Sequence, residues 1–193
     1  MKVRLTFQEG VLGTAPQNEE IYTDFIASKA PDCSTLEEEV AALGVDEVVE
    51  KGKTVFPKEE GRPFLYDYQV KGFFKGACGF LREVPGTESS KLKAYKKKID
   101  GLIFVYPRKI FFENYGEVGN CQRSLRAQTM QGERISLANS DEIQAGAQIE
   151  FEIECLNEAH ESAVIEWLNY GQKSGIGQWR NSGKGRFTWE EVE

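Results

Sequence analysis

The chain has 193 residues, of which 40% are hydrophobic and 28% charged, as in a globular domain with a core of its own. No apolar run approaches the roughly 18 residues of a membrane span and no signal peptide opens the chain, so we expect a cytoplasmic protein. The single histidine, His160, and four cysteines without a C-x-x-C pair argue against histidine catalysis, disulfides and zinc. We therefore predict reduced thiols, no metal and no cofactor.

The net charge of −7 is unevenly distributed along the chain. Residues 1–60 carry 6 Lys and Arg against 13 Asp and Glu, and residues 135–193 carry 4 against 11. Residues 61–134 carry 14 against 7. The basic middle would attract nucleic acid and the acidic ends would repel it, so charge alone leaves the partner open.

The N-terminal third is predicted to hold a strand and two helices. Residues 2–7 alternate polar and apolar side chains, which is typical of a half-buried strand. Residues 19–28 fit a short helix, and Ser34 to Glu37 has the spacing of a capping box that opens a second one. Residues 46–61 are charged and poorly patterned, which indicates a loop or an inserted subdomain.

A third helix is predicted over residues 69–82, where apolar side chains recur three and four positions apart. It contains Gly72, Gly76 and Gly79, each of which weakens a helix by roughly 1 kcal/mol relative to alanine. We interpret them as places of close approach, either by the sheet or by a ligand. The lysine-rich run at 91–98 fits a solvated surface, and phosphate contact is the alternative.

The second half reads as strands followed by a helix and a last strand. Residues 102–106 form a continuous apolar run that predicts a fully buried strand, residues 110–112 continue it, and residues 121–129 fit a strand or hairpin arm. Residues 149–155 alternate most clearly. Their glutamates, Glu150 among them, are interpreted as a solvent face that pairs with Lys2 or Arg4 across the sheet.

The predicted last helix begins with Asn157 as its N-cap and stops at Gly171, and residues 187–189 close the chain as a strand. This order of elements predicts an α+β fold with helices on one face of a sheet.

Between Gly171 and Phe187 the chain has five glycines, four cations, one tryptophan and no carboxylate. Glycine allows close backbone approach, and cations with backbone N–H groups suit an anion such as phosphate. A P-loop over residues 177–184 is excluded, because the glycine spacing is wrong and Gly185 stands where Ser or Thr would hold magnesium. No nucleophile elbow occurs either, which favours a protein that is not an enzyme.

Three segments resemble the RAMP superfamily, which comprises the repeat-associated backbone subunits of CRISPR effector complexes and their processing relatives. Residues 64–77 resemble its S-x-x-K-G-x-x-R helix start, with Lys71-Gly72 matching, Lys75 in place of the arginine, and Tyr68 or Gln69 in place of the serine. Residues 175–187 are similar to its C-terminal glycine-rich loop, and residues 144–151 resemble its P-A-G-T-x-F strand start without the proline. The N-terminal strand ending at Gly13 is compatible as well. The order and spacing of all four pieces agree with the superfamily, so the resemblance spans most of the chain.

The resemblance implies a single RAMP-like domain over residues 1–193, with a helical or loop insertion at about 30–62. Its fold would be a ferredoxin-like (RRM-like) sheet that has helices on one face, a C-terminal Gly-rich loop, and the backbone of single-stranded RNA as its ligand. Trp179 would either stack on a base or ribose or anchor the loop in the core. The residues assigned to RNA binding are Lys71, Lys75, Trp179, Arg180, Lys184, Arg186, Gly175, Gly177, Gly183 and Gly185.

The chain departs from the superfamily in being acidic and short, which keeps other functions open. It could be a phage-encoded anti-CRISPR or anti-defence protein that mimics an effector subunit and blocks a host nucleic-acid-binding complex with acidic faces such as residues 37–39 and 150–154. A third alternative is a metal-independent RNA endonuclease. The expected partner is single-stranded RNA or a CRISPR-type ribonucleoprotein complex and not a membrane, and the sequence leaves the oligomeric state open.

Overall fold

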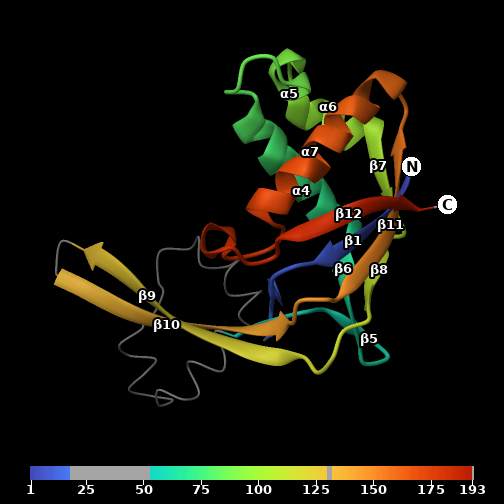
Figure 1. Cartoon of the computed structure of the whole chain (residues 1–193). Coiled ribbons are helices and arrows are strands. Elements are labelled where there is room, and N and C mark those ends of the chain that lie inside the picture. The colour runs from blue at the N-terminus through green and yellow to red at the C-terminus, as the bar shows by residue number, and fades with distance from the viewer. Residues whose placement is uncertain (18–52, 130–131, 193) are drawn as a thin grey trace, which may run out of the picture. The chain divides into compact units, whose positions relative to one another are not determined.

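The computed structural model describes residues 1–17, 53–129 and 132–192 (Figure 1). The chain divides into two compact units, which are described separately below. The larger unit comprises Met1–Val11, Pro57–Val118 and Ile143–Glu193, and the smaller one Leu12–Phe56 and Gly119–Glu142. Sheets and helices occur together, so the predicted α+β class is confirmed. The helices expected at 19–28 and after residue 34 lie outside the described residues, as does the expected insertion except for residues 53–62.

The larger unit is built on a seven-stranded sheet. Its strands follow the order β12 (Phe187–Val192), β1 (Lys2–Phe7), β11 (Gln148–Cys155), β8 (Lys109–Glu113), β6 (Arg62–Tyr66) and β5 (Lys58–Glu59). A further strand, β7 (Ile103–Tyr106), also pairs with β11. All of these pairings are antiparallel, and β1 lies between β11 and β12.

The two faces of this sheet differ in polarity because side chains alternate along each strand. Leu5 lies opposite Ile149 on the buried face, and Arg4 lies opposite Glu150 on the other face. The Arg4 Nη2 atom is 2.6 Å from Glu150 Oε1, and Lys2 Nζ is 3.5 Å from Glu150 Oε2. These hydrogen-bonded cations, Arg4 first, lower the pKa of the Glu150 carboxyl. The cross-sheet pairing predicted for Glu150 is confirmed, and we call the face that carries it the open face.

Helices α4 (Asp67–Leu81), α5 (Glu88–Lys91), α6 (Tyr95–Leu102) and α7 (Glu161–Ser174) pack on the same side of the sheet (Figure 1). The predicted helix over residues 69–82 is confirmed as α4. Its apolar stripe is buried against the sheet and α7, where the rings of Phe74 and Trp167 lie 5.5 Å apart, both fully buried. Burial of one such large side chain contributes about 1.5–3 kcal/mol, so this contact helps to fix α4 against α7.

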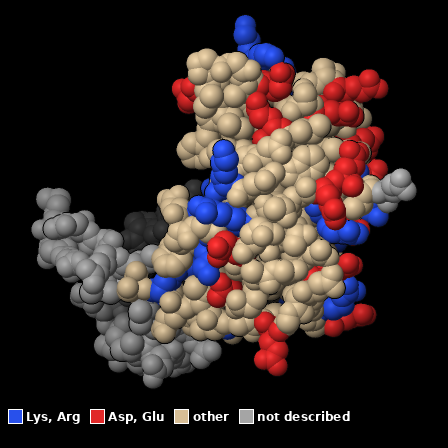
Figure 2. Space-filling view, viewed as in Figure 1, with Lys and Arg blue, Asp and Glu red and all other residues tan. Residues whose placement is uncertain are grey.

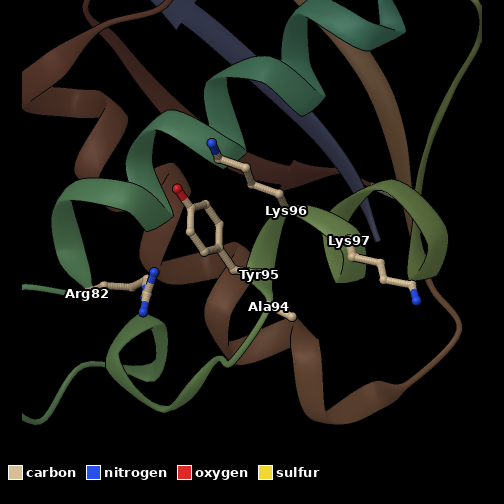
Figure 3. A pocket seen from close by; sticks show the side chains of 5 residues that line it. All are labelled: Arg82, Ala94, Tyr95, Lys96 and Lys97. Atoms are coloured by element: carbon tan, nitrogen blue, oxygen red, sulfur yellow. The ribbon is translucent and has the colours of Figure 1, made fainter.

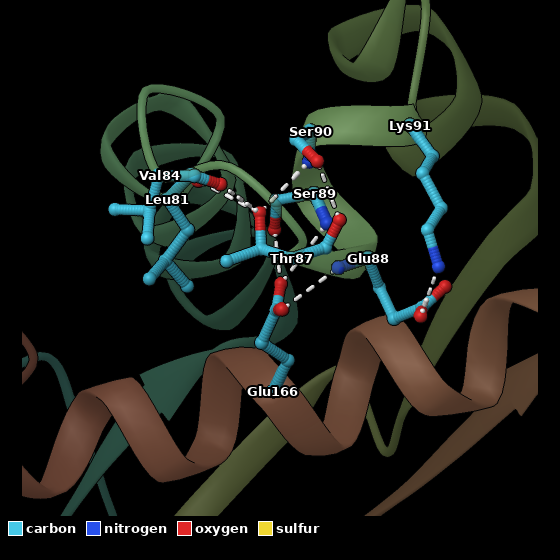
Figure 4. A network of polar contacts seen from close by, with 8 residues as sticks. All are labelled: Leu81, Val84, Thr87, Glu88, Ser89, Ser90, Lys91 and Glu166. Atoms are coloured by element: carbon cyan, nitrogen blue, oxygen red, sulfur yellow. Dashed lines mark hydrogen bonds and ion pairs between the residues drawn. The ribbon is translucent and has the colours of Figure 1, made fainter.

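A polar network joins α5 to α7 and to the end of α4 (Figure 4). The carboxylate of Glu166 accepts hydrogen bonds from the backbone N–H groups of Glu88 (2.8 Å) and Ser89 (3.0 Å) and from the Ser89 hydroxyl (2.5 Å). Trp167 Nε1 donates to Ser89 Oγ at 2.9 Å, and the Thr87 hydroxyl donates to carbonyl oxygens at and just beyond the end of α4. The turn after α4 is therefore held by satisfied buried polar groups.

The boundaries of α7 differ from the prediction. Gly171 does not end the helix, which continues to Ser174 and stops at Gly175, whose φ is 72°. A side chain at Gly171 would overlap the ring of Phe187, so this glycine makes room for packing. Asn157 does act as a cap, but for the 3₁₀ turn η1 (Glu158–His160): its side-chain oxygen accepts from the N–H two residues further on at 3.0 Å.

The region of residues 91–106 also departs from the expectation. The predicted fully buried strand is β7, in which Ile103 and Val105 are buried but Tyr106 is 47% exposed. The side chains of β7 that point away from the core lie on the open face of the sheet. An apolar run in the sequence does not show which of its residues point that way. The lysines at 96–98 lie on α6, which is anchored by the buried Ile99.

The smaller unit contains a five-stranded sheet. Its strands follow the order β2 (Val11–Leu12), β10 (Gly132–Ile143), β4 (Thr54–Val55) and β3 (Ala15–Pro16), and β9 (Gly119–Thr129) pairs with β10 as a hairpin. The strand predicted at 121–129 is thus confirmed. Lys53 forms an ion pair of 2.9 Å with the buried Asp141.

The described cysteines, Cys78, Cys121 and Cys155, are free thiols. Burial raises the pKa of the Cys78 and Cys155 thiols.

Candidate nucleic-acid interface

Residues 175–186, here called the C-terminal loop, fold back on themselves between α7 and β12. Ile176 N donates to Gly185 O at 2.9 Å, and Gly185 N donates to Gly10 O at 2.9 Å. Gly175 and Gly185 both have a φ of 72°, and a side chain on either would overlap the backbone of the opposite arm. These two glycines are therefore explained by the close approach of the two arms.

The backbone of this loop offers fewer donors than the sequence suggested. Gly175 N donates to Gly171 O at 2.8 Å, and Gly183 N donates to Arg180 O at 2.9 Å. With Gly185 bonded to Gly10, three of the four glycine N–H groups expected to serve an anion are used within the chain. These three N–H groups are therefore already hydrogen-bonded within the chain, which leaves the cationic side chains as the loop's main attraction for anions. Gly177, with a φ of 88°, is exposed.

The basic side chains of this region gather over the end of α7 and the C-terminal loop (Figure 2). They are Lys173, Arg180, Lys184 and Arg186. Lys173 and Arg186 are exposed, and Arg180 and Lys184 are half-buried. Trp179 precedes the 3₁₀ turn η2 (Arg180–Ser182) with a φ of 58° and is 37% exposed. It therefore lies outside the core.

The C-terminal loop meets α4 at Gly76. A Cβ atom built on Gly76 would lie 3.5 Å from Arg180 Nη1, so the guanidinium lies over the helix where α4 has no side chain. Within the described part of the chain, no ion pair involves Arg180. This contact joins the cation-rich loop to the glycine-containing helix.

We call Gly72, Gly76 and Gly79 the glycine face of α4. Apart from its chain neighbours and the backbone of its own helix, no heavy atom of the described residues lies within 4 Å of a Cβ at Gly72. At Gly79, by contrast, the Tyr95 hydroxyl oxygen would lie 3.1 Å from a Cβ. The glycine face is thus bare at Gly72 and bordered by side chains further along the helix. Packing within the described chain requires no glycine at Gly72.

Lys71 and Lys75 turn from α4 toward α6. Lys71 Nζ donates to the backbone oxygen of Asp100 at 3.0 Å and lies 5.2 Å from the centre of the Phe104 ring. Lys75 Nζ lies 2.5 Å from Asp100 Oδ1. The structure therefore groups these two lysines around Asp100 and groups Arg180 with Gly76.

A shallow hollow of about 320 Å³ lies between the end of α4 and the start of α6 (Figure 3). Arg82 and Lys96 flank Tyr95 there, and the Arg82 guanidinium carbon is 5.1 Å from the centre of the Tyr95 ring. The Tyr95 hydroxyl in turn borders the glycine face at Gly79. Sequence reasoning missed this hollow because the lysine-rich run was interpreted as a solvated surface.

Other features bear on chemistry. His160 is buried, and burial together with nearby Lys98 lowers the pKa of its imidazole. Among residues 1–17, 53–129 and 132–192, no three His, Cys, Asp or Glu side chains are grouped as metal ligands would be. None of the described helices is long and apolar enough to cross a membrane.

No protein-family model matches the chain, and no curated protein matches it in sequence. In structure, it resembles a chain of the Type III-B Cmr-beta complex, whose cryo-EM structure was determined bound to cognate target RNA. That match has a TM-score of 0.54 and 11% identity, and it covers 100% of this chain and 58% of the other. A chain of a Type IV-B CRISPR complex matches with a TM-score of 0.45 and 11% identity over 98% of this chain and 88% of the other. The fold is therefore similar to that of a CRISPR effector complex subunit, and the chain spans 58% of that Cmr-beta chain's length.

Proposed function

We propose that this protein is a RAMP-like subunit that binds the backbone of single-stranded RNA between its C-terminal loop and the glycine face of α4. The proposal treats residues 1–193 as one domain with an insertion and the larger sheet as ferredoxin-like. The strand order β12-β1-β11-β7 supports that assignment, because α4 lies between β1 and β7 in the sequence and α7 between β11 and β12.

The observation that carries the proposal is the bare helix surface at Gly72, with Arg180 over the neighbouring Gly76. Each glycine costs about 1 kcal/mol of helix stability relative to alanine. No side chain of the described residues approaches Gly72 closely enough to require a glycine there. A ligand whose backbone lies against the helix would explain why Gly72 is kept.

Charge favours a polyanion as this ligand. The stretch from Gly171 to Phe187 has four cations and no carboxylate, and three of the cations, Arg180, Lys184 and Arg186, belong to the C-terminal loop. We expect these three to contact phosphates and Trp179 to stack on a base or ribose. Lys71 and Lys75 would border the RNA on the side toward α6, with weaker effect because both interact with Asp100. Gly177, Gly183 and the other loop glycines would shape this surface.

The proposal is tested by fluorescence anisotropy with a labelled single-stranded RNA over a range of salt concentrations. Changing Lys184 and Arg186 together to alanine is expected to weaken binding and to lower the slope of log K against log salt by about 1.4, since each phosphate contact on a single strand contributes about 0.7. Lys91→Ala with Lys93→Ala removes the same charge from exposed lysines outside the site and is the matched control. No retention of RNA by the wild type at low salt, or an equal loss in the control, contradicts the proposal.

A CRISPR-type ribonucleoprotein is the partner that this proposal implies, and the fold similarity to the Cmr-beta chain supports it. The second candidate, a phage anti-CRISPR protein, is favoured by one observation: Glu152, Glu154 and Glu190 form exposed carboxylates on the open face. That candidate predicts no affinity for RNA but salt-sensitive co-purification with a basic effector complex, weakened by Glu152→Gln with Glu154→Gln.

A further inference from the structure

A phenylalanine of α4 is strongly exposed on the same side as the glycine face. Phe80 is 63% exposed, and its ring is stacked on that of Tyr170 from α7, with centroids 6.5 Å apart and planes at 28°. Phe80 follows Gly76 by four residues, so the two lie one above the other on the helix, about 6 Å apart along its axis. The exposed ring is therefore a neighbour of the position that the Arg180 guanidinium covers.

The two rings are held in place by rigid packing beneath them. α4 and α7 are fixed to each other through the buried Phe74 and Trp167, and Tyr170 precedes Gly171, which packs closely against Phe187. Exposure of an aromatic ring forfeits the burial energy of its apolar surface, about 25 cal/mol per Å². Because Phe80 and Tyr170 are held in position while the Phe80 ring stays exposed, they are suited to stack with another flat apolar group.

We propose that Phe80 and Tyr170 form a stacking platform for a base of single-stranded RNA, an inference that rests on the RNA-binding function proposed above. A base stacks on Phe80 while a phosphate of the same strand meets Arg180 beside Gly76. The platform accepts any base, because stacking uses the π face common to all four. It adds a second stacking position to the one proposed for Trp179.

The neighbourhood favours RNA over a protein segment as the occupant. The C-terminal loop beside the platform has cations and no carboxylate, and no described ion pair involves Arg180. A second exposed aromatic group contrasts with it: Tyr68, stacked on Tyr66, lies beside Arg108, whose charge is paired with Asp67 at 2.6 Å. Because its charge is paired with Asp67, Arg108 attracts a phosphate less strongly than Arg180 does.

The test compares Phe80→Ala and Phe80→Leu with the wild type, using a uniform single-stranded RNA and an abasic oligonucleotide of the same length. Loss of one stacked base is expected to weaken RNA binding by about 5- to 150-fold in Phe80→Ala. Phe80→Leu keeps apolar volume without the ring and should lose nearly as much. Binding of the abasic strand should be unchanged in both. Ile165→Ala, an exposed apolar position on α7, is the matched control and should bind like the wild type.

The outcomes separate the two proposals. Suppose that the wild type binds RNA, that the double alanine variant of Lys184 and Arg186 binds it more weakly, and that both Phe80 variants bind it normally. The stacking platform is then wrong, and the proposed backbone-binding site stands. If the Phe80 variants lose affinity for the RNA and for the abasic strand equally, Phe80 has a purely structural role and the platform proposal is overturned. Loss of a co-purifying protein with RNA binding unchanged identifies a protein-docking surface instead. A wild type that retains no RNA at low salt overturns both proposals.

Discussion

Replacement of Gly72 by alanine should make the protein more stable and a poorer RNA binder. Outside its own helix turn, a Cβ at this position meets no heavy atom of the described residues within 4 Å, and Gly72 lies inside α4, so the helix gains about 1 kcal/mol without a steric cost. For a chain of this length, that gain raises Tm by about 2–4 °C. Gly76→Ala should gain a similar amount, since its Cβ would lie 3.5 Å from Arg180 Nη1, an ordinary contact. Gly79→Ala should gain less, because the Tyr95 hydroxyl would lie 3.1 Å away.

The added methyl group would occupy the surface that the RNA backbone is proposed to use. If the methyl group displaces the RNA enough to weaken one of its hydrogen bonds, the loss of about 1 kcal/mol corresponds to roughly fivefold weaker binding, which we expect of Gly72→Ala and Gly76→Ala. Thermal denaturation followed by circular dichroism and RNA anisotropy measure the two effects on the same samples. Gly101→Ala, a helix glycine of α6 with an equally open surrounding, is the control for stability without an effect on RNA. A variant that gains stability and binds RNA as tightly as the wild type would refute the assignment of the glycine face to RNA.

Four further predictions concern the scaffold. Glu166→Ala removes the acceptor of three hydrogen bonds, including the one from the buried Ser89 hydroxyl, so the free energy of unfolding should fall by about 1–3 kcal/mol. Denaturant unfolding measures this loss. As a control, replacement of the exposed Glu161 by alanine should change the denaturant midpoint little. Gly171→Ala forces a Cβ against the Phe187 and Phe73 rings and should cost about 1–3 kcal/mol by the same measurement; an unchanged midpoint would mean that the rings move freely. The pKa of the Glu150 carboxyl is lower in the folded protein than its ordinary value of 4.5, so the ionised carboxylate stabilises the fold fully above pH 4.5. That stability is lost as the pH falls through the pKa of the folded state. The Tm of Glu150→Gln should therefore fall less in acid than the Tm of the wild type. The lowered pKa of His160 means that protonation favours unfolding below 6.5; its imidazole NMR signals should titrate below that pH, and titration at or above 6.5 would contradict its burial.

Elements with a strong local pattern were predicted correctly from the sequence. The alternation in residues 2–7 and 149–155 identified β1 and β11 and even the pairing of Glu150 with Arg4, because one buried face fixes the register. The three-and-four spacing of apolar residues identified α4 in the presence of its three glycines.

The errors arise where tertiary contacts override local signals. Gly171 looks like a helix stop, yet it lies within α7, where it makes room for the Phe187 ring of the following strand β12. Residues 102–106 look fully buried because an apolar run does not distinguish a core position from an aromatic on the open face, such as Tyr106.

The candidate site was only partly accessible to sequence reasoning. The cations of the C-terminal loop and the glycines of α4 were found from composition, but their meeting at Arg180 and Gly76 depends on how α7 packs beside α4. The engagement of Lys71 and Lys75 with Asp100 and the stacking of Phe80 on Tyr170 join different elements, so no local pattern predicts them.

Photo-crosslinking of a single-stranded RNA to the wild-type protein, with the crosslinked residues mapped by mass spectrometry, tests the RNA-binding account most directly. We predict crosslinks within residues 72–80 and 175–186. Crosslinks confined to the open face of the sheet, on β1 and β11, would contradict it.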